Sequence, residues 1–272
     1  MYSRQKVILI TGSTDGIGFE TAKALVQQGH HVLLHGRNPS KLKDVEQQLV
    51  AISDEAKIQS YVADLSVLAD VDALADKVIA EHDKIDVLIN NAGVFNTPNP
   101  ITKDGLDVRF VVNTISPYHL TKRLLPVLGA SSRVVNLSSA AQAAVNIEAL
   151  EGKKPLSDGD AYAQSKLAIT MWTREMAKEL GSTGPMVVAV NPASLLGSKM
   201  VKDAYGIAGG DLSIGSDILV RASLSDEFAQ AGGQYFDNDN NTFANPHPDA
   251  IYGDKSQQVV AKIEEIIKAT LS

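Results

Sequence analysis

Short apolar runs alternate along the chain with longer segments whose apolar positions recur every three or four residues. The runs are rich in β-branched residues, as strands buried on both faces of a parallel sheet are, and cover residues 6–11, 30–37, 58–65, 85–93, 132–139 and 185–193. The amphipathic segments between them predict helices over residues 19–29, 39–52, 66–82, 107–128 and 161–180. Strands separated by helices of this length require right-handed crossovers, so the pattern predicts an α/β protein with a doubly wound parallel β-sheet and helices on both faces.

The pattern loosens toward the C-terminus. Small and polar residues fill 194–215 and a polar loop covers 237–249, so we expect these segments to form a lid over a substrate site. The part from 232 to 272 closes with a further amphipathic helix over 256–271. Because no linker or internal repeat interrupts the chain, residues 1–272 are predicted to form a single domain.

Composition narrows the classes of function. A net charge of −7 argues against a general nucleic-acid surface, and the absence of cysteine excludes disulfides, thiol catalysis and thiolate metal sites and agrees with a reducing compartment. The apolar runs are far shorter than the roughly 20 residues that cross a bilayer, and the first residues lack the apolar region of a leader peptide. We therefore expect a cytoplasmic protein that binds neither nucleic acid nor a membrane. The six histidines show no metal-ligand spacing, so no metal site is predicted.

A glycine-rich turn, TGSTDGIG, follows the first strand. Its glycines allow the backbone to approach a pyrophosphate, while the N–H groups of the next helix attract the negative charge. The alternative is a tight strand-to-helix corner, because the spacing differs from GxGxxG. On the first interpretation the turn binds a dinucleotide cofactor through Gly12, Ser13, Thr14, Asp15, Gly16, Ile17 and Gly18.

The end of the second strand indicates which dinucleotide. Gly36 stands where a carboxylate would repel a 2′-phosphate, and Arg37 beside it is a planar, permanently charged group. The pair favours NADP(H) over NAD(H). The alternative is that Arg37 is solvated in a surface turn.

The third and fourth strands end in polar residues. Asp64 and Leu65 are placed to meet the adenine, although a carboxylate that caps the next helix would give the same pattern, and Ser66 is expected as the N-cap of that helix. The sequence NNAG ends the fourth strand, and its asparagines are expected mainly to bridge neighbouring strand ends. The residues predicted to lie against the cofactor here are Asn91, Ala92 and Gly93.

Tyr162 and Lys166 lie one helical turn apart on the helix after the fifth strand, so they share one face. A phenol titrates near about 10, and a nearby cation favours the phenolate, so this pair can supply or remove a proton near neutral pH. The alternative for the pair alone is a tyrosine and a snorkelling lysine on an ordinary helix face.

Taken together, TGSTDGIG, NNAG, Asn113, NLSS, YAQSK and NPA, in this order and at these strand ends, resemble the short-chain dehydrogenase/reductase family over roughly residues 5–200. The segments SRVVNLSS, YAQSKLAITMWTREMAKEL and GGQYF resemble its retinol dehydrogenase-like and WW-domain oxidoreductase-like branch. The resemblance implies a Rossmann fold and an enzyme that transfers a hydride between nicotinamide and a CH–OH or carbonyl group.

The resemblance also assigns roles to residues of this chain. Tyr162 is the general acid and base, Lys166 lowers the pKa of the phenol and holds the nicotinamide ribose, and Asn113 keeps a helix open for a water that relays protons. Ser139 positions the substrate oxygen. Because alternate strand residues face opposite sides, Ser138 is expected to be buried against the neighbouring helix.

On the nicotinamide side, the resemblance implies contacts from Pro192, Ala193, Ser194 and Ser198. This chain departs from the family there, with Ala193 in place of a glycine and Ser198 in place of a threonine. Both changes exchange one small residue for another. They could shift the nicotinamide pocket without removing a group that the chemistry needs.

The expected partner is a small, moderately apolar carbonyl or alcohol, with the insertion 140–161 as one wall of its pocket. The resemblance allows a homodimer or homotetramer through the helices that carry Asn113 and Tyr162. Two other functions are compatible with parts of the pattern. A nucleotide-sugar epimerase or dehydratase shares the glycine turn and YxxxK but usually has a larger domain than residues 194–272 offer. A redox-sensing regulator would bind NADP(H) without turnover, but such proteins tend to lose the tyrosine or the lysine.

Overall fold

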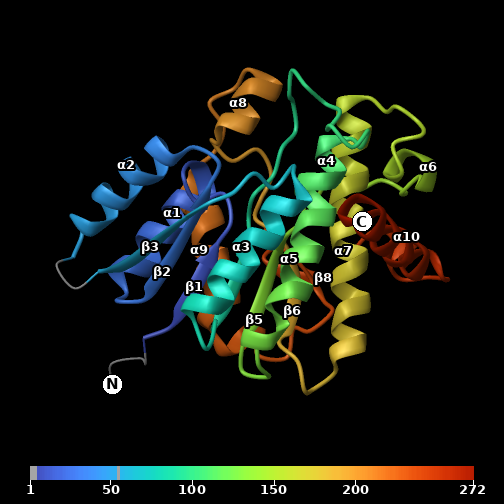
Figure 1. Ribbon diagram of the computed structural model, residues 1–272. Helices are drawn as coiled ribbons and strands as arrows, with labels where there is room; N and C mark the ends of the chain where they lie inside the picture. The colour runs from blue at the N-terminus through green and yellow to red at the C-terminus, as the bar shows by residue number, and fades with distance from the viewer. Residues whose placement is uncertain (1–4, 54–55) are drawn as a thin grey trace.

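The computed structural model describes residues 5–53 and 56–272; residues 1–4, part of the segment expected to lack a leader peptide, lie outside it. The predicted sheet is confirmed, and its strands follow the order β3-β2-β1-β4-β5-β6-β7-β8 (Figure 1). All neighbouring strands are parallel except the last pair. The strands are β1 (Val7–Ile10), β2 (His31–Gly36), β3 (Lys57–Val62), β4 (Val87–Asn90), β5 (Arg133–Leu137), β6 (Met186–Asn191), β7 (Tyr235–Asp237) and β8 (Thr242–Ala244).

Helices cover both faces of the sheet, as predicted (Figure 1). One face carries α3 (Leu68–Glu81), α4 (Val108–Phe110), α5 (Ser116–Leu124) and α7 (Asp158–Leu180), and the other carries α1 (Gly16–Gln27), α2 (Pro39–Val50) and α9 (Leu212–Leu224). The remaining helices are α6 (Ile147–Leu150), α8 (Lys199–Tyr205), α10 (Lys255–Leu271) and the 3₁₀ turns Leu125–Val127, Asp226–Phe228 and Pro248–Ala250.

The central strands are buried on both sides. In β1, Leu9 belongs to the core beneath α3, α5 and α7, whereas Ile8 and Ile10 belong to the core beneath α1 and α9, and all three are 0% exposed. This is why the strand has no polar alternation in the sequence. A buried sheet of this kind holds the carboxyl ends of its strands in fixed relative positions.

The helix predicted over 107–128 is divided in the structure. Residues Val111–Ile115 form a π-helix between α4 and α5. Pro117 has no N–H to donate to the carbonyl of Asn113 four residues earlier, and its ring crowds that carbonyl. The wider turn accommodates both effects, with the Ser116 N–H donating to the Val111 carbonyl.

Two other expectations are corrected. The polar segment 237–249 is not only a loop, because Tyr235–Asp237 and Thr242–Ala244 pair as an antiparallel hairpin that extends the sheet. Ser66 does not cap α3, whose N-cap is Val67 without a side-chain bond. The hydroxyl and the N–H of Ser66 both donate to Asp64 instead.

The C-terminal helix α10 lies along α7 on the side away from the sheet (Figure 1). Val259 and Ile263 of α10 are buried in the same core as Trp172 of α7. The Tyr118 hydroxyl of α5 donates to Glu264 of α10 at 2.7 Å. The part of the α7 surface around Trp172 is therefore covered by the chain itself.

Across residues 5–53 and 56–272, no helix is both long and apolar enough to cross a membrane. Within the same ranges, no group of three or more histidine, aspartate or glutamate side chains is arranged to hold a metal ion.

Candidate active site at the carboxyl ends of the strands

One cavity of about 450 Å³ lies at the carboxyl ends of the strands, where the strand order reverses between β1 and β4. The predicted residues that line it are Gly12, Thr14, Asp15, Gly16, Ile17, Gly18, Arg37, Asp64, Leu65, Asn91, Ala92, Gly93, Tyr162, Lys166, Pro192 and Ser198. Five predicted residues are not among the described residues that line it: Ser13, Asn113, Ser139, Ala193 and Ser194.

The glycine turn has the conformation that its sequence requires. Gly12 and Gly16 have φ of +65° and +56°, in the region that favours glycine. A Cβ on Gly18 would lie 2.4 Å from Asn91 Nδ2 and 2.4 Å from the Gly12 carbonyl oxygen. Asp15 caps α1 by accepting from the Gly16 N–H at 2.7 Å. The turn therefore presents backbone rather than side chains to the cavity, at the positive end of a helix.

His35 anchors this turn, and the sequence pattern did not single it out. Its Nδ1 accepts from the Gly12 N–H at 3.1 Å, so the ring proton must lie on Nε2, which contacts the Ala63 carbonyl at 3.2 Å. Burial lowers the pKa of His35 to about 4, so the ring is neutral near neutral pH. Ser13 is fully buried and bonds the backbone of the same histidine, which explains why it faces away from the cavity.

The cavity widens into a basic end beside β2. Gly36 leaves no room for a side chain, because a Cβ would lie 2.6 Å from Thr14 Cγ2. Arg37 is exposed there, and Lys41 in the first turn of α2 also lines the cavity. Lys41 was missed because a lysine in the amphipathic segment 39–52 looks like any solvated helix residue. The sequence offered no signal for Lys41, since Arg37 precedes α2 and the two residues share no helix face.

The asparagines after β4 bridge strand ends, as expected. Asn90 donates to Asn136 of β5 at 2.8 Å, and Asn91 donates to the Thr11 and Gly12 carbonyls at 2.9 Å each. These bonds fix the glycine turn against β4. Gly93 faces the catalytic end, where an added Cβ would lie 3.6 Å from Lys166 Nζ.

Tyr162 and Lys166 do meet on α7. Lys166 Nζ lies 5.6 Å from the centroid of the Tyr162 ring and donates to the Leu137 carbonyl at 2.8 Å. Lys166 is 4% exposed, and burial lowers its pKa to about 8. The half-buried Tyr162 ring packs edge-on against Phe95, with the ring centroids 4.8 Å apart. The phenol is thereby held between a cation and an aromatic wall.

The two serines after β5 face different ways. Ser138 is buried, and its hydroxyl lies 2.7 Å from Thr170 Oγ1 and 3.1 Å from the Lys166 carbonyl, both on α7. This confirms the expectation that Ser138 is buried against the neighbouring helix. Ser139 is half-buried, and its hydroxyl accepts from the Ala141 N–H at 3.1 Å.

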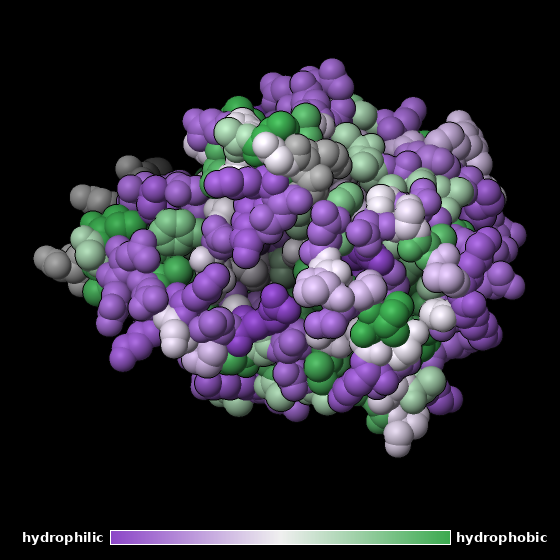
Figure 2. Space-filling model, turned by 90° about the horizontal axis from the view of Figure 1, so that it is seen from above, coloured by the Kyte–Doolittle hydropathy of each residue, from purple (hydrophilic) through white to green (hydrophobic). Residues whose placement is uncertain are grey.

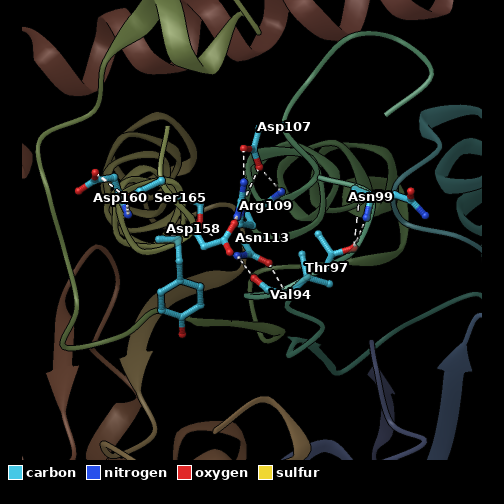
Figure 3. Close-up of polar contacts among 11 residues, drawn as sticks. Val94, Thr97, Asn99, Asp107, Arg109, Asn113, Asp158, Asp160 and Ser165 are labelled. Carbon is cyan, nitrogen blue, oxygen red and sulfur yellow. Dashed lines mark hydrogen bonds and ion pairs between the residues drawn. The ribbon is translucent and has the colours of Figure 1, made fainter. Parts of the chain in front are cut away.

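Asn113 occupies the centre of the π-helix and is 0% exposed. Its side-chain amide accepts from the Val94 N–H at 2.8 Å and donates to the Val94 carbonyl and to Ser165 Oγ, each at 3.0 Å (Figure 3). Asn113 therefore connects the loop after β4 with α7. The helix is wider at this residue, and the role of Asn113 in keeping it open for a water stays a prediction.

The segment after β6 is held in a strained shape. Ala193 has φ of +119°, where the family has a glycine. Both sides of this residue are bonded to the loop between β7 and β8, since Asn191 Nδ2 donates to Asp237 and Asp239 while the N–H and hydroxyl of Ser194 donate to Asp239. The loop 237–249 contributes no described residue to the cavity and holds the segment after β6 through Asp239. Its expected place in a lid is not what the structure shows.

The lid segment 194–215 covers one end of the cavity through Ser198, Lys199, Met200 and Asp203. Ser198 caps α8 by accepting from the Val201 N–H at 3.3 Å. The two ends of the lid are tied together, because the Gly197 N–H donates to the Gly210 carbonyl at 2.7 Å and the Gly210 N–H donates to the Leu195 carbonyl at 2.8 Å. Seen from above, this edge of the molecule is mostly hydrophilic, with hydrophobic side chains in small separate groups (Figure 2).

Comparisons with known proteins agree with this arrangement. The family model of the short chain dehydrogenases matches residues 6–205. Retinol dehydrogenase 12 of Mus musculus is 34% identical over 244 residues, which are 85% of this chain and 77% of the relative. Polyprenol dehydrogenase of Homo sapiens is 36% identical over 192 residues, 68% of this chain and 58% of the relative. Among solved structures, an uncharacterized protein from Mycobacterium paratuberculosis superposes with a TM-score of 0.81 at 24% identity, over 97% of this chain and 94% of that one.

Proposed function

The chain belongs to the short-chain dehydrogenase family and is an oxidoreductase of CH–OH groups; we propose that it prefers NADP(H) and exchanges a hydride with an apolar aldehyde, ketone or alcohol, with Tyr162 as general acid and base. The observation that carries this proposal is the single cavity that runs from the glycine turn to Tyr162 and Lys166.

The residues present fit a dinucleotide. The turn from Gly12 to Gly18 excludes side chains from the space in which a pyrophosphate would sit, next to the N-terminus of α1. Arg37 and Lys41 place two cations at the β2 end of the cavity, and Gly36 excludes the carboxylate that an NAD-binding site uses for the ribose. This charge balance supports the preference for a 2′-phosphate.

When bound, the nicotinamide donates or accepts the hydride. In reduction, the Tyr162 hydroxyl gives its proton to the substrate oxygen, and in oxidation the phenolate takes it back. Lys166 in its ammonium form lies near the ring and stabilises the phenolate. Ser139 is the residue expected to orient the substrate oxygen, once its hydroxyl turns from the Ala141 N–H toward the cavity.

The substrate end of the cavity supports an apolar ligand. Val94, Phe95, Val112 and Met200 line it beside the Tyr162 ring. Two relatives are named for the alcohols retinol and polyprenol, both long and apolar. We therefore propose a hydrophobic aldehyde or alcohol rather than a sugar or a small hydroxy acid.

We further propose that any homodimer or homotetramer does not pack on the part of α7 around Trp172, because α10 covers it. Light scattering on the purified protein would give the mass of the assembly. A dimer found with α10 in place would have to use a surface other than this part of α7. A cytoplasmic location also remains our proposal, which cell fractionation would test.

The test is absorbance at the reduced-nicotinamide band with NADPH or NADH and a panel of retinal, steroid ketones and short aldehydes. Tyr162→Phe is the variant, and Tyr252→Phe, whose ring is 70% exposed and outside the cavity, is the matched control. We expect NADPH to be consumed faster than NADH, Tyr162→Phe to be inactive and Tyr252→Phe to behave as wild type. NADPH binding without turnover on any member of the panel would favour the redox-sensing regulator instead.

A further inference from the structure

A buried arginine lies one helical turn before Asn113. Arg109 in α4 is 2% exposed, and among the described residues only Arg109 and Lys166 are buried members of the lysine and arginine class. Its Nε donates to Asp107 Oδ1 at 2.8 Å and its second terminal nitrogen donates to Asp107 Oδ2 at 2.6 Å. Its remaining terminal nitrogen pairs with Asp158, the first residue of α7 (Figure 3). None of these three residues is among those described that line the cavity.

This ion pair joins the helical stretch before Asn113 to the start of α7. Another connection lies further along both segments, where Asn113 Nδ2 donates to Ser165 Oγ and Thr114 Oγ1 donates to the Ser165 carbonyl at 2.6 Å. Asp158 precedes Tyr162 by one turn, and Ser165 follows it by three residues, with the Ser165 hydroxyl donating to the Tyr162 carbonyl at 2.7 Å. The backbone of Tyr162 therefore lies between two fixed points.

We propose that Arg109 is a positioning residue: by holding Asp158, it fixes the first turn of α7 and with it the Tyr162 hydroxyl relative to the substrate. This inference rests on the proposed function, in which Tyr162 is the proton donor. Asp158 also lies in the insertion 140–161, so the same pair fixes one expected wall of the substrate pocket.

Stability alone does not account for an arginine at this position. A buried guanidinium loses its hydration, and apolar residues of similar volume usually replace buried ion pairs without loss of stability. Asp158 has a side-chain exposure of 55% and could be solvated without a partner. The planar guanidinium adds direction, because its fixed arrangement of N–H groups holds two carboxylates from separate elements, Asp107 before α4 and Asp158 of α7.

A displacement of about 1 Å at a reacting group lowers the rate by roughly 100-fold. We therefore expect Arg109→Gln and Arg109→Lys to lower kcat between about 10-fold and 100-fold, because lysine keeps the charge but not the planar arrangement of N–H groups. The Kd for NADPH should stay within about twofold of wild type, since the glycine turn, Arg37 and Lys41 are untouched. Asp158→Asn should lower kcat in the same range, and the double variant should be no slower than the slower single variant.

The matched control is Arg123→Gln. Arg123 on α5 also bridges two carboxylates, Asp72 and Asp76 of α3, but contacts neither α7 nor the cavity. Thermal unfolding gives the midpoint of each variant. Steady-state kinetics and NADPH fluorescence titration are then measured on all variants well below those midpoints. A merely structural Arg109 would lower the midpoint and leave kcat of the folded protein unchanged, and that result would overturn the proposal.

Amide hydrogen exchange separates this proposal from the proposed function. Residues 158–165 should exchange faster in Arg109→Gln than in wild type or in Arg123→Gln, whether or not a substrate is known. A wild-type protein without turnover would refute the proposed function, while unchanged exchange over 158–165 would overturn the role of Arg109. If Arg109→Gln does not fold, the same measurements of kcat and of exchange over residues 158–165 are made on Asp158→Asn, whose side chain is half-exposed.

Discussion

Replacing Lys166 with methionine should abolish turnover and at the same time stabilise the empty protein. Lys166 is 4% exposed, and burial alone lowers its pKa from an ordinary 10.5 to about 8. A difference of this size corresponds to roughly 3 kcal/mol by which burial disfavours the ammonium in the folded state at pH 7. Methionine fills a similar volume without charge, and it forfeits the bond to the Leu137 carbonyl, worth about 1 kcal/mol. The expected net gain for Lys166→Met is about 2 kcal/mol.

The pH dependence of this gain tests its cause. The unfolded chain holds its proton up to about 10.5 and the folded one only up to about 8, so the unfolded state binds more protons between these values. The penalty on wild type is therefore complete below pH 8, declines as pH rises toward 10.5 and is absent above it. The advantage of Lys166→Met should shrink by about 2 kcal/mol between pH 7 and pH 9.5.

The assay is urea unfolding of the cofactor-free protein at pH 7 and pH 9.5, followed by circular dichroism. Lys43→Met is the matched control, since Lys43 is exposed on α2 and removes no buried charge. A Lys166→Met protein that is less stable than wild type at pH 7, or a difference that does not change with pH, would refute the argument from burial.

Three further changes test other parts of the site. Ala193→Gly should raise the free energy of unfolding by roughly 1 kcal/mol in urea titrations, because Ala193 has φ of +119°, and a loss of stability would show that the backbone is not strained there. Gly18→Ala should weaken NADPH binding at least about tenfold by fluorescence titration, because its Cβ would lie 2.4 Å from Asn91, whereas Gly159→Ala in α7 meets no atom within 4 Å and should bind normally. Arg37→Ala should raise the KM for NADPH by about 10-fold to 100-fold and leave that for NADH unchanged; equal effects on both would place Arg37 outside the 2′-phosphate site.

The parallel sheet, both helical layers and most of the cavity followed from the sequence because parallel strands bring their carboxyl ends to one edge whatever their separation in the chain. The glycine turn, Asn91 and the pair Tyr162 and Lys166 each stand at such an end, so motif and position support one another. The pairing of β7 with β8 could not be foreseen. Its strands are three residues each, too short for an alternating pattern.

The features that the sequence did not show depend on contacts between distant residues. In the sequence, His35 is one histidine within an apolar strand, and its role appears only when both ring nitrogens are seen to bond, one to the Gly12 N–H and the other to the Ala63 carbonyl. Ser66 has the right residue type for an N-cap. Its hydroxyl and its N–H both donate to the Asp64 carboxylate two residues earlier instead, and the helix begins after Val67. Arg109 was not singled out from the sequence, because its two partners lie before α4 and at the start of α7.

The lid is a loop whose two ends are joined to each other by backbone hydrogen bonds. At its base, backbone hydrogen bonds join Gly210 to Leu195 and Gly197, and Ser194 donates to Asp239. Residues 198–209 are therefore attached to the rest of the protein through a fixed base. Doubling the length of such a loop costs only about 0.6 kcal/mol in closure entropy. We therefore expect that exchanging residues 198–209 would change the cavity lining at Ser198, Lys199, Met200 and Asp203, and with it the substrate range, while Tyr162 on α7 and the bonded base of the lid stay in place.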